Sequence, residues 1–221
     1  MYEGTKRLLA LQPDIALLQE RLRQIPSLPP GWDRLRMWTG VQLEELRAIA
    51  VGTGPRTARA ALAARLFWEA SATAQRFATD PNSIKLFMEG MIKDVEEVTK
   101  ALHSLAKYLE PQLGEDVKRE ATSVSGPVMA LGEGRKIRRW PFGKQLATTE
   151  AEREVYDSIA AILNKHAHAT PFFLLAPRED DAQIWFLVCR ALEQARRLVT
   201  LLEAFAGSLG KPKGRTLEDS A

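Results

Sequence analysis

Residues 80–109 read DPNSIKLFMEGMIKDVEEVTKALHSLAKYL, and this stretch decides the fold class. Its apolar residues recur every three or four positions, which predicts one face of a long amphipathic α-helix. They are Ile84, Phe87, Met88, Met91, Ile92, Val95, Val98, Leu102, Leu105 and Leu109. Asp80 can cap the start of this helix, and Pro81 fits its first turn. The charged residues fall on the opposite face, which is typical of a solvent-exposed surface.

The same period recurs on both sides of this stretch. Long helices are predicted over residues 56–78, 149–168 and 181–206, and shorter ones over residues 13–25 and 41–50. Thr149 and Glu152 form a capping box at the start of one long helix. No segment alternates as a strand does. The sequence therefore predicts an all-α fold, an antiparallel helical bundle of four long helices with shorter helices before them.

Two segments break the helical period. Residues 25–32, IPSLPPGW, are rich in proline and predict an extended connector. Residues 111–142 are punctuated by glycine and proline, which predicts a long connection with at most one short helix over residues 115–122. We therefore expect three segments: N-terminal helices with the connector (1–54), the helical bundle (55–206) and a flexible tail (207–221).

Composition limits the classes of function. The chain of 221 residues has 31 Lys and Arg against 28 Asp and Glu, an excess of 31 − 28 = 3 charges. This excess is too small to make the whole surface a nucleic-acid binder. The single cysteine, Cys189, excludes an internal disulfide and a cysteine-based metal site. No apolar run approaches the roughly 20 residues that cross a bilayer, and residues 1–24 lack the apolar core of a secretory signal. We expect a cytoplasmic protein that makes no membrane contact.

Motifs of metal and cofactor chemistry are missing from the sequence. None of the three histidines follows a glutamate by three positions, so the Glu-x-x-His pairs of helical di-metal sites are absent. H-E-x-x-H, the P-loop pattern and G-x-S-x-G do not occur, and the glycine-rich VGTGP and GEGR follow no predicted strand. We therefore predict neither a metal ion nor a cofactor.

Polar residues gather on two of the predicted helices. One stripe, at steps of four, three and four residues, comprises Asp157, Ala161, Asn164 and His168. Arg65 and Glu69 lie four residues apart in ARLFWEA, a spacing that favours an ion pair between apolar neighbours. One interpretation is that Arg65, Glu69 and His168 satisfy one another as structural groups. The other is a polar cleft that accepts an anionic ligand.

The motifs RLFWEA (65–70), RRWPF (138–142), YDSI (156–159) and NKHAHATP (164–171) occur in this order. Over residues 56–206 the chain thereby resembles an uncharacterised bacterial family, domain of unknown function 5677, of the HEPN-like helical superfamily. The resemblance implies an all-α bundle without a settled activity, in a bacterial stress or defence setting. It also implies that a common cleft is faced by the recurring polar residues Arg65, Glu69, Tyr156 and His168.

HEPN ribonucleases have an arginine four to six residues before a histidine, contributed by each of two protomers. This chain has Asn164, Leu163 and Ile162 at those positions before His168. A ribonuclease would therefore use His168 to transfer the proton and take a guanidinium such as Arg65 from another helix. This metal-independent, degenerate ribonuclease is the enzymatic alternative.

Basic residues are concentrated between residues 118 and 144, next to aromatic ones. Such a segment suits phosphate contact combined with base stacking. Its candidate binding residues are Arg135, Arg138, Arg139 and Trp140. The alternative is that the arginines pair with acidic helix faces, including Glu96, Glu97, Glu115 and Asp116.

The leading hypothesis is a helical binding module, non-catalytic or weakly catalytic, for RNA or another anionic partner. Two alternatives stay open: the ribonuclease with His168 as catalytic residue, and a homodimeric interaction scaffold that uses apolar helix faces. The predicted binding residues are Arg65, Glu69, Tyr156, Asn164, Arg135, Arg138, Arg139 and Trp140.

Overall fold

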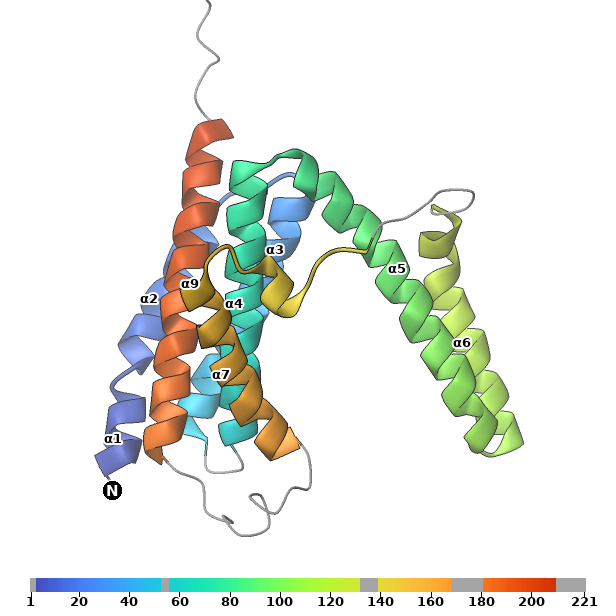
Figure 1. Ribbon diagram of the computed structural model, residues 1–221, viewed down its shortest axis with the longest axis horizontal. Helices are drawn as coiled ribbons and strands as arrows, with labels where there is room; N and C mark the ends of the chain where they lie inside the picture. Colours follow the sequence, from blue (N-terminus) through green and yellow to red (C-terminus); the bar gives the residue numbers. More distant parts are fainter. Residues whose placement is uncertain (1–2, 53–55, 132–138, 168–180, 210–221) are drawn as a thin grey trace, which may run out of the picture. The chain divides into compact units, whose positions relative to one another are not determined.

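The computed structural model describes residues 3–52, 56–131, 139–167 and 181–209 (Figure 1). Every regular element in these ranges is a helix, so the predicted all-α class is confirmed. The α-helices are α1 (Glu3–Leu9), α2 (Gln12–Gln24), α3 (Pro30–Val51), α4 (Thr57–Thr79), α5 (Asn82–Leu105), α6 (Pro111–Ala130), α7 (Glu150–Ala167) and α9 (Asp181–Leu209). Two short 3-10 helices are η1 (Ala106–Tyr108) and η2 (Gly143–Leu146). None of the described helices is long and apolar enough to span a membrane.

The chain divides into two compact units. The larger unit comprises residues 1–78 and 142–221, and the hairpin unit comprises residues 79–141. This division differs from the expected limits at residues 54 and 206, because α3 packs against α9 and so joins the N-terminal helices to the C-terminal one. The tail beyond residue 209 lies outside the described residues.

The core of the larger unit lies where α3, α4 and α9 meet. Trp32 of α3 stacks on Phe205 of α9, with ring centroids 4.4 Å apart, and meets Phe77 of α4 edge-on at 5.5 Å. The alanines of α4 let neighbouring helices approach closely, and those that are buried are Ala60, Ala61, Ala63, Ala64, Ala70 and Ala74. Burial of this apolar surface is the main source of stability for the unit.

Helix α3 begins eleven residues before the predicted start at residue 41. The extended connector is therefore shorter than expected. Pro29 and Pro30 stand at the start of the helix, where a backbone N–H has no acceptor within the helix and its absence costs nothing. Buried residues then recur at helical spacing: Trp32, Leu35, Thr39, Leu43 and Leu46. The prolines therefore mark a helix start, and the expectation of an extended chain through residue 32 was wrong.

The hairpin unit consists of α5 and α6, joined by η1 and packed against each other. Helix α6 covers twenty residues, so the expected loop with a short helix over 115–122 was wrong. Two observations explain the longer helix. Pro111 occupies the first turn, and Gly114 lies so close to η1 that an added Cβ would sit 2.5 Å from the Ala106 carbonyl oxygen. Pro127 lies inside α6 and cannot donate a backbone hydrogen bond there, yet the helix continues past it to Ala130.

Candidate functional site

Three of the predicted polar residues meet in the larger unit. Arg65 Nε on α4 donates a hydrogen bond to Glu69 Oε1 at 3.0 Å, as the spacing of four predicts. Tyr156 on α7 donates from its hydroxyl to the same Oε1 at 3.2 Å. The Arg65 guanidinium lies over the Tyr156 ring, 5.6 Å from its centroid. We call Arg65, Glu69 and Tyr156 the polar cluster.

The surroundings of the polar cluster fix the tyrosine. Its ring packs against Trp68 with centroids 5.0 Å apart. Gly143 of η2 has φ +59° and lies so close that an added Cβ would be 2.7 Å from the Tyr156 hydroxyl. Burial, together with the negative charge of Glu69, raises the pKa of Tyr156. The hydroxyl therefore remains protonated at neutral pH and keeps its role as the donor to Glu69.

The polar cluster has its hydrogen-bonding groups turned inward. One carboxylate accepts from both partners, and it also balances the arginine charge. The hydrogen bond from Tyr156 to Glu69 therefore links α7 to α4. For Arg65 and Glu69 this geometry agrees with the interpretation as structural groups, and residue 168, the third member of that interpretation, lies outside the described residues.

The other residues expected around the predicted cleft lie elsewhere. Asn164 is exposed on α7, as are Asp157 and Ala161 of the same predicted stripe. Tyr156 and Ile159, by contrast, are the buried residues among the side chains of this helix that the structure describes. Residue 168, the predicted catalytic histidine, lies outside the described residues. The structure thus joins Arg65, Glu69 and Tyr156, and it does not bring Asn164 to them.

The predicted basic segment is used partly within the hairpin unit. Arg139 pairs with Glu97 of α5. Trp140 is 9% exposed, and its ring meets Phe87 edge-on at 5.3 Å. An added Cβ at Gly90 would sit 2.7 Å from the Trp140 Cβ and 3.0 Å from its backbone nitrogen, so the two backbones are in close contact. The indole is a core residue there, and positions 135 and 138 lie outside the described residues.

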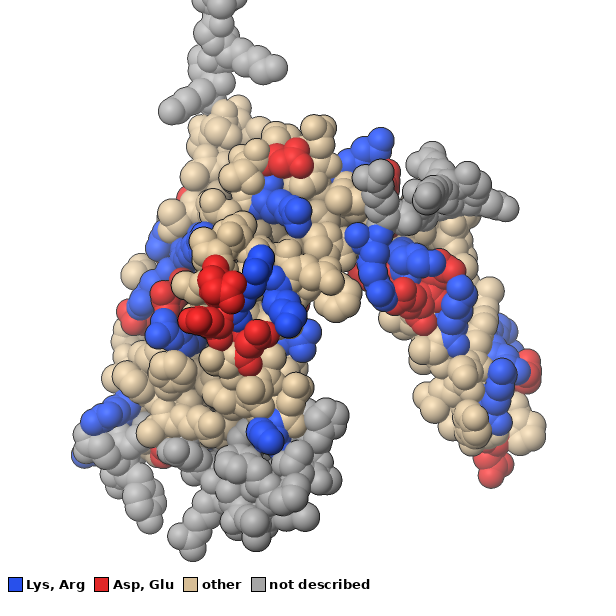
Figure 2. Space-filling model, in the orientation of Figure 1, with Lys and Arg blue, Asp and Glu red and all other residues tan. Residues whose placement is uncertain are grey.

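Ion pairing extends to other basic residues of the hairpin unit. Lys118 pairs with Glu115 at 2.6 Å and Arg119 with Asp116 at 2.5 Å. Figure 2 shows basic and acidic side chains mixed along α5 and α6 on the face in view. This is the arrangement expected if the basic residues pair with acidic helix faces.

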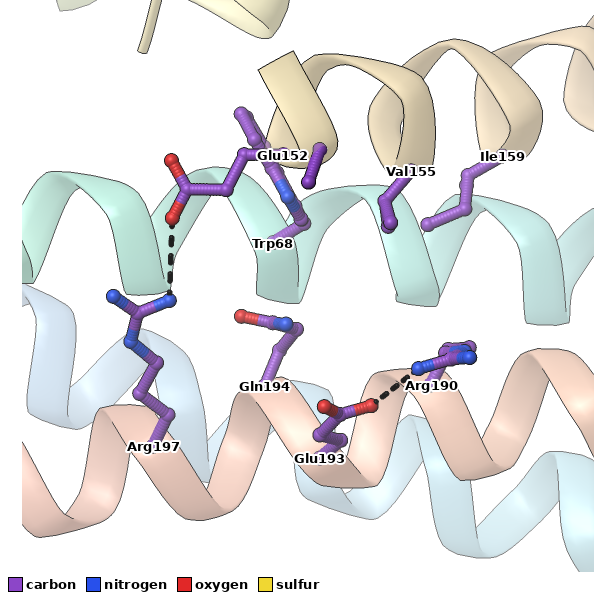
Figure 3. Close-up of a pocket in the computed structure, with 9 residues that line it drawn as sticks. Trp68, Glu152, Val155, Ile159, Arg190, Glu193, Gln194 and Arg197 are labelled. Carbon is purple, nitrogen blue, oxygen red and sulfur yellow. Dashed lines mark hydrogen bonds and ion pairs between the residues drawn. The ribbon is translucent and has the colours of Figure 1, made fainter. Parts of the chain in front are cut away.

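A small pocket of about 170 Å³ lies beside the polar cluster, between α4, α7 and α9. Figure 3 shows Trp68, Val155 and Ile159 at its apolar side. Its charged groups are paired: Arg190 with Glu193 at 2.8 Å, and Arg197 with Glu152 at 3.6 Å. The space is below the roughly 300 Å³ at which pockets usually hold organic ligands. We therefore assign this pocket no ligand.

Glu152 also fixes the start of α7. Its backbone N–H donates to Thr149 Oγ1 at 3.2 Å, one half of the predicted capping box. Its carboxylate accepts from the backbone N–H and the hydroxyl of Thr148, each at 2.8 Å. Burial opposes ionisation, but these hydrogen bonds prevail and lower the pKa of Glu152. The carboxylate is therefore a structural cap.

The ion pair between Arg56 and Asp181 could not be predicted from the sequence. Arg56, whose side chain is 9% exposed, donates from Nη2 to Asp181 Oδ1 at 2.7 Å. The other oxygen of Asp181 accepts from the Thr5 hydroxyl at 3.2 Å. The contacts join the start of α9 to α1 and to the residue before α4. The partners are 125 and 176 residues apart in the chain, so no local pattern reveals them.

A larger groove lies in the hairpin unit. It has a volume of about 470 Å³, within the range of ligand-binding cavities. Its apolar lining is provided by Val95, Val98, Leu102, Val117 and Ala121. Val98 is 59% exposed, and Leu105 and Leu113 are exposed farther toward the turn of the hairpin. A contiguous exposed apolar surface often marks a site where another molecule binds.

Polar groups stand at one end and along the edges of this groove. Asp94 and Glu120 line it, and neither forms an ion pair within the described residues. Burial, and the charge of nearby Glu97, raise the pKa of Asp94, and the charge of Arg139 opposes this in part. Ser125 also lines the groove, and its buried hydroxyl has no hydrogen-bond partner among the described residues. The groove therefore offers an apolar surface with unpaired polar groups beside it.

Comparison with known proteins adds no relative: no family model, curated protein or solved structure matches this chain.

Proposed function

We propose that the protein is a non-catalytic helical binding module that captures a partner protein through the apolar groove between α5 and α6. In this proposal the larger unit is an antiparallel, HEPN-like bundle that serves as the support, and the setting is cytoplasmic. The observation that carries the proposal is the 470 Å³ groove with exposed Val98 at its centre. An apolar face left open by two packed helices is typical of a surface that binds another helix.

The polar cluster supports a non-catalytic role. One oxygen of its carboxylate, Glu69 Oε1, accepts from both Arg65 and Tyr156, at 3.0 Å and 3.2 Å. A general acid or base would need a group free to exchange a proton with a substrate. The RNA-binding hypothesis draws less support, because Arg139 is paired and Trp140 is buried. These contacts favour a protein partner over a nucleic acid.

A dye-binding experiment tests whether the groove is an open apolar surface in solution. The full-length protein is titrated with an apolar fluorescent dye, alongside the variants Val98→Asp and Leu17→Asp. Leu17 of α2 is the matched control because it is 58% exposed, as Val98 is at 59%, but lies in the larger unit. We expect Val98→Asp to lose most of the dye signal and Leu17→Asp to retain it. Equal signals from the two variants would contradict the proposal.

A second assay separates binding from catalysis. Single-stranded RNA is incubated with the wild-type protein and with His168→Ala, and its length and retention are followed at increasing salt concentration. The proposal expects intact RNA and no salt-sensitive complex. Cleavage that is lost in His168→Ala would establish the ribonuclease instead.

A further inference from the structure

The groove of the hairpin unit has a charge pattern that selects among partners. Four carboxylates elsewhere on the two helices are held by cations of the same unit. Glu96 pairs with Lys93 and Lys100, Glu97 with Arg139, Glu115 with Lys118, and Asp116 with Arg119. The two carboxylates that line the groove, Asp94 and Glu120, form no ion pair within the described residues, and Arg139, which acts on Asp94 electrostatically, is paired with Glu97.

The groove lining contains no positive group. Its nine residues include two carboxylates and neither lysine nor arginine. A ligand that fills the apolar part therefore meets the negative charge of Glu120 and of Asp94, which the nearby Arg139 offsets only in part. Complementary charge across an interface favours one partner over others and speeds their encounter.

The shape of the groove favours a helix. It runs between two packed helices, and a third helix can fill such a groove by setting its side-chain ridges between theirs. The lining from Asp94 to Leu102 extends about 12 Å along α5, given a rise of 1.5 Å per residue. Exposed Leu105 and Leu113 continue the apolar surface toward the turn. An amphipathic helix of three to four turns matches this length.

A second copy of the chain is a poorer match. A symmetric contact brings the same patch of each subunit to the other. Asp94 and Glu120 of one copy would then lie in the same interface as Asp94 and Glu120 of the other. The groove lining offers no lysine or arginine to offset these charges. Like charges enclosed together oppose association.

We infer that the groove binds an amphipathic helix of another protein whose apolar stripe is flanked by lysine or arginine, with Asp94 and Glu120 selecting the basic residues. The inference rests on the proposed function, since it requires the groove to be a binding surface. The unpartnered hydroxyl of Ser125 marks the end of the groove where a polar side chain of the partner is accommodated.

Two synthetic peptides test the charge preference on the full-length protein. Both have about 20 residues, long enough to form a helix, and share one leucine and alanine stripe. One carries lysine on its polar face, and the other carries glutamate. Binding is followed by fluorescence anisotropy at low and at physiological salt. We expect the lysine peptide to bind about tenfold more tightly, with a ratio that shrinks as salt screens the charges.

Two variants define how the lysine peptide is held. The double variant Asp94→Asn with Glu120→Gln removes the negative edges, so both peptides are expected to bind with similar, weaker affinity. Val98→Asp introduces a charge into the apolar centre, so binding of the lysine peptide is expected to be lost. Because this variant also adds negative charge, purely electrostatic attraction would instead become stronger. Undiminished binding to Val98→Asp would overturn the inference.

The remaining outcomes are equally decisive. Equal affinity for the two peptides would overturn the charge preference while the groove, tested by the dye, stands. Binding of neither peptide, together with a dimer in sedimentation equilibrium that Val98→Asp dissociates, would show that a second copy occupies the groove. If the wild-type protein does not bind the dye, the proposed function itself is rejected.

Discussion

The larger unit and the hairpin unit cover their apolar helix faces to different extents. The largest fully buried side chains all belong to the larger unit, among them Trp32, Phe67 and Phe77. The buried residues of α5 and α6 are small or polar, such as Gly90, Thr99 and Ala121. Large side chains such as Val98 and Leu105 stay exposed there.

This difference separates stability from binding. In the larger unit, Tyr156 donates to Glu69 of another helix, and the ring of Trp32 packs against Phe77 of another helix. In the hairpin unit, two helices alone cannot enclose the apolar stripe that both present. The residues that most resemble a reaction centre in the sequence therefore make contacts between helices of the larger unit, and the uncovered face of the hairpin unit is the candidate for binding.

The largest expected effect comes from breaking the buried ion pair of the larger unit. Asp181→Ala leaves the Arg56 guanidinium buried without its partner, and we expect the free energy of unfolding to fall by about 3 kcal/mol. Denaturant unfolding measures the change. Removing both charges, as Arg56→Met with Asp181→Ala, should restore part of the loss. A decrease below about 1 kcal/mol in the single variant would show that water reaches the arginine.

The polar cluster is expected to give the next largest effect. Glu69→Ala removes the acceptor of both Arg65 and Tyr156, so we expect a loss of about 1–3 kcal/mol in the free energy of unfolding. Thermal unfolding followed by circular dichroism checks it. Glu69→Gln, which keeps an acceptor for the tyrosine, should lose less. An unchanged melting curve for Glu69→Ala would mean that the cluster does not hold α7 to α4.

Much of the fold follows from the sequence, because its apolar stripes are long and its helix ends carry caps. Helix α4 begins and ends within one residue of the predicted range 56–78, and α7 begins one residue after Thr149. The full length of helix α6 was not predicted, because glycine and proline normally interrupt helices. In this chain Gly114 permits a close contact with Ala106, a tertiary effect that the local pattern cannot reveal.

The candidate site was predictable only where it is local. The spacing of Arg65 and Glu69 predicts their ion pair, and the partner Tyr156 came from the family resemblance. Trp140 lay beside arginines and suggested stacking, but its contact with Phe87 depends on how the chain returns to α5. The groove was not predicted for a related reason. A regular apolar stripe predicts a covered helix face, and only the packing of the helices shows which part of that face stays exposed.

A smaller change tests the unpaired hydroxyl of the hairpin unit. Ser125→Ala removes a buried oxygen that has no partner among the described residues, so we expect stability to rise by about 0.5 kcal/mol. Thr99→Ala is the matched control, because Thr99 Oγ1 donates to the Val95 carbonyl at 2.8 Å. Its loss should lower stability by about 1 kcal/mol. A decrease for Ser125→Ala, measured by denaturant unfolding, would reveal a hydrogen bond of Ser125 in solution.

The smallest expected effect depends on pH. The pKa of Asp94 is raised by burial and by the charge of Glu97. The protonated carboxyl therefore favours folding below its ordinary pKa of 3.8, and this contribution is lost as the pH rises through the folded value. Asp94→Asn cannot ionise, so we expect it to exceed the wild type by about 0.5 kcal/mol at pH 7 and to match it near pH 3. Thermal unfolding at the two pH values measures the stability difference between Asp94→Asn and the wild type. The same difference at both pH values would contradict the prediction.

Amide hydrogen exchange of the full-length protein, with and without the lysine peptide, tests the contrast between the units most directly. We expect amides of α4 and α9 to exchange slowly in both states, because their faces are covered by the protein itself. Amides of α5 and α6 should exchange faster in the free protein and become protected when the peptide is added. Equal protection of both units without peptide, and no change with it, would contradict the account.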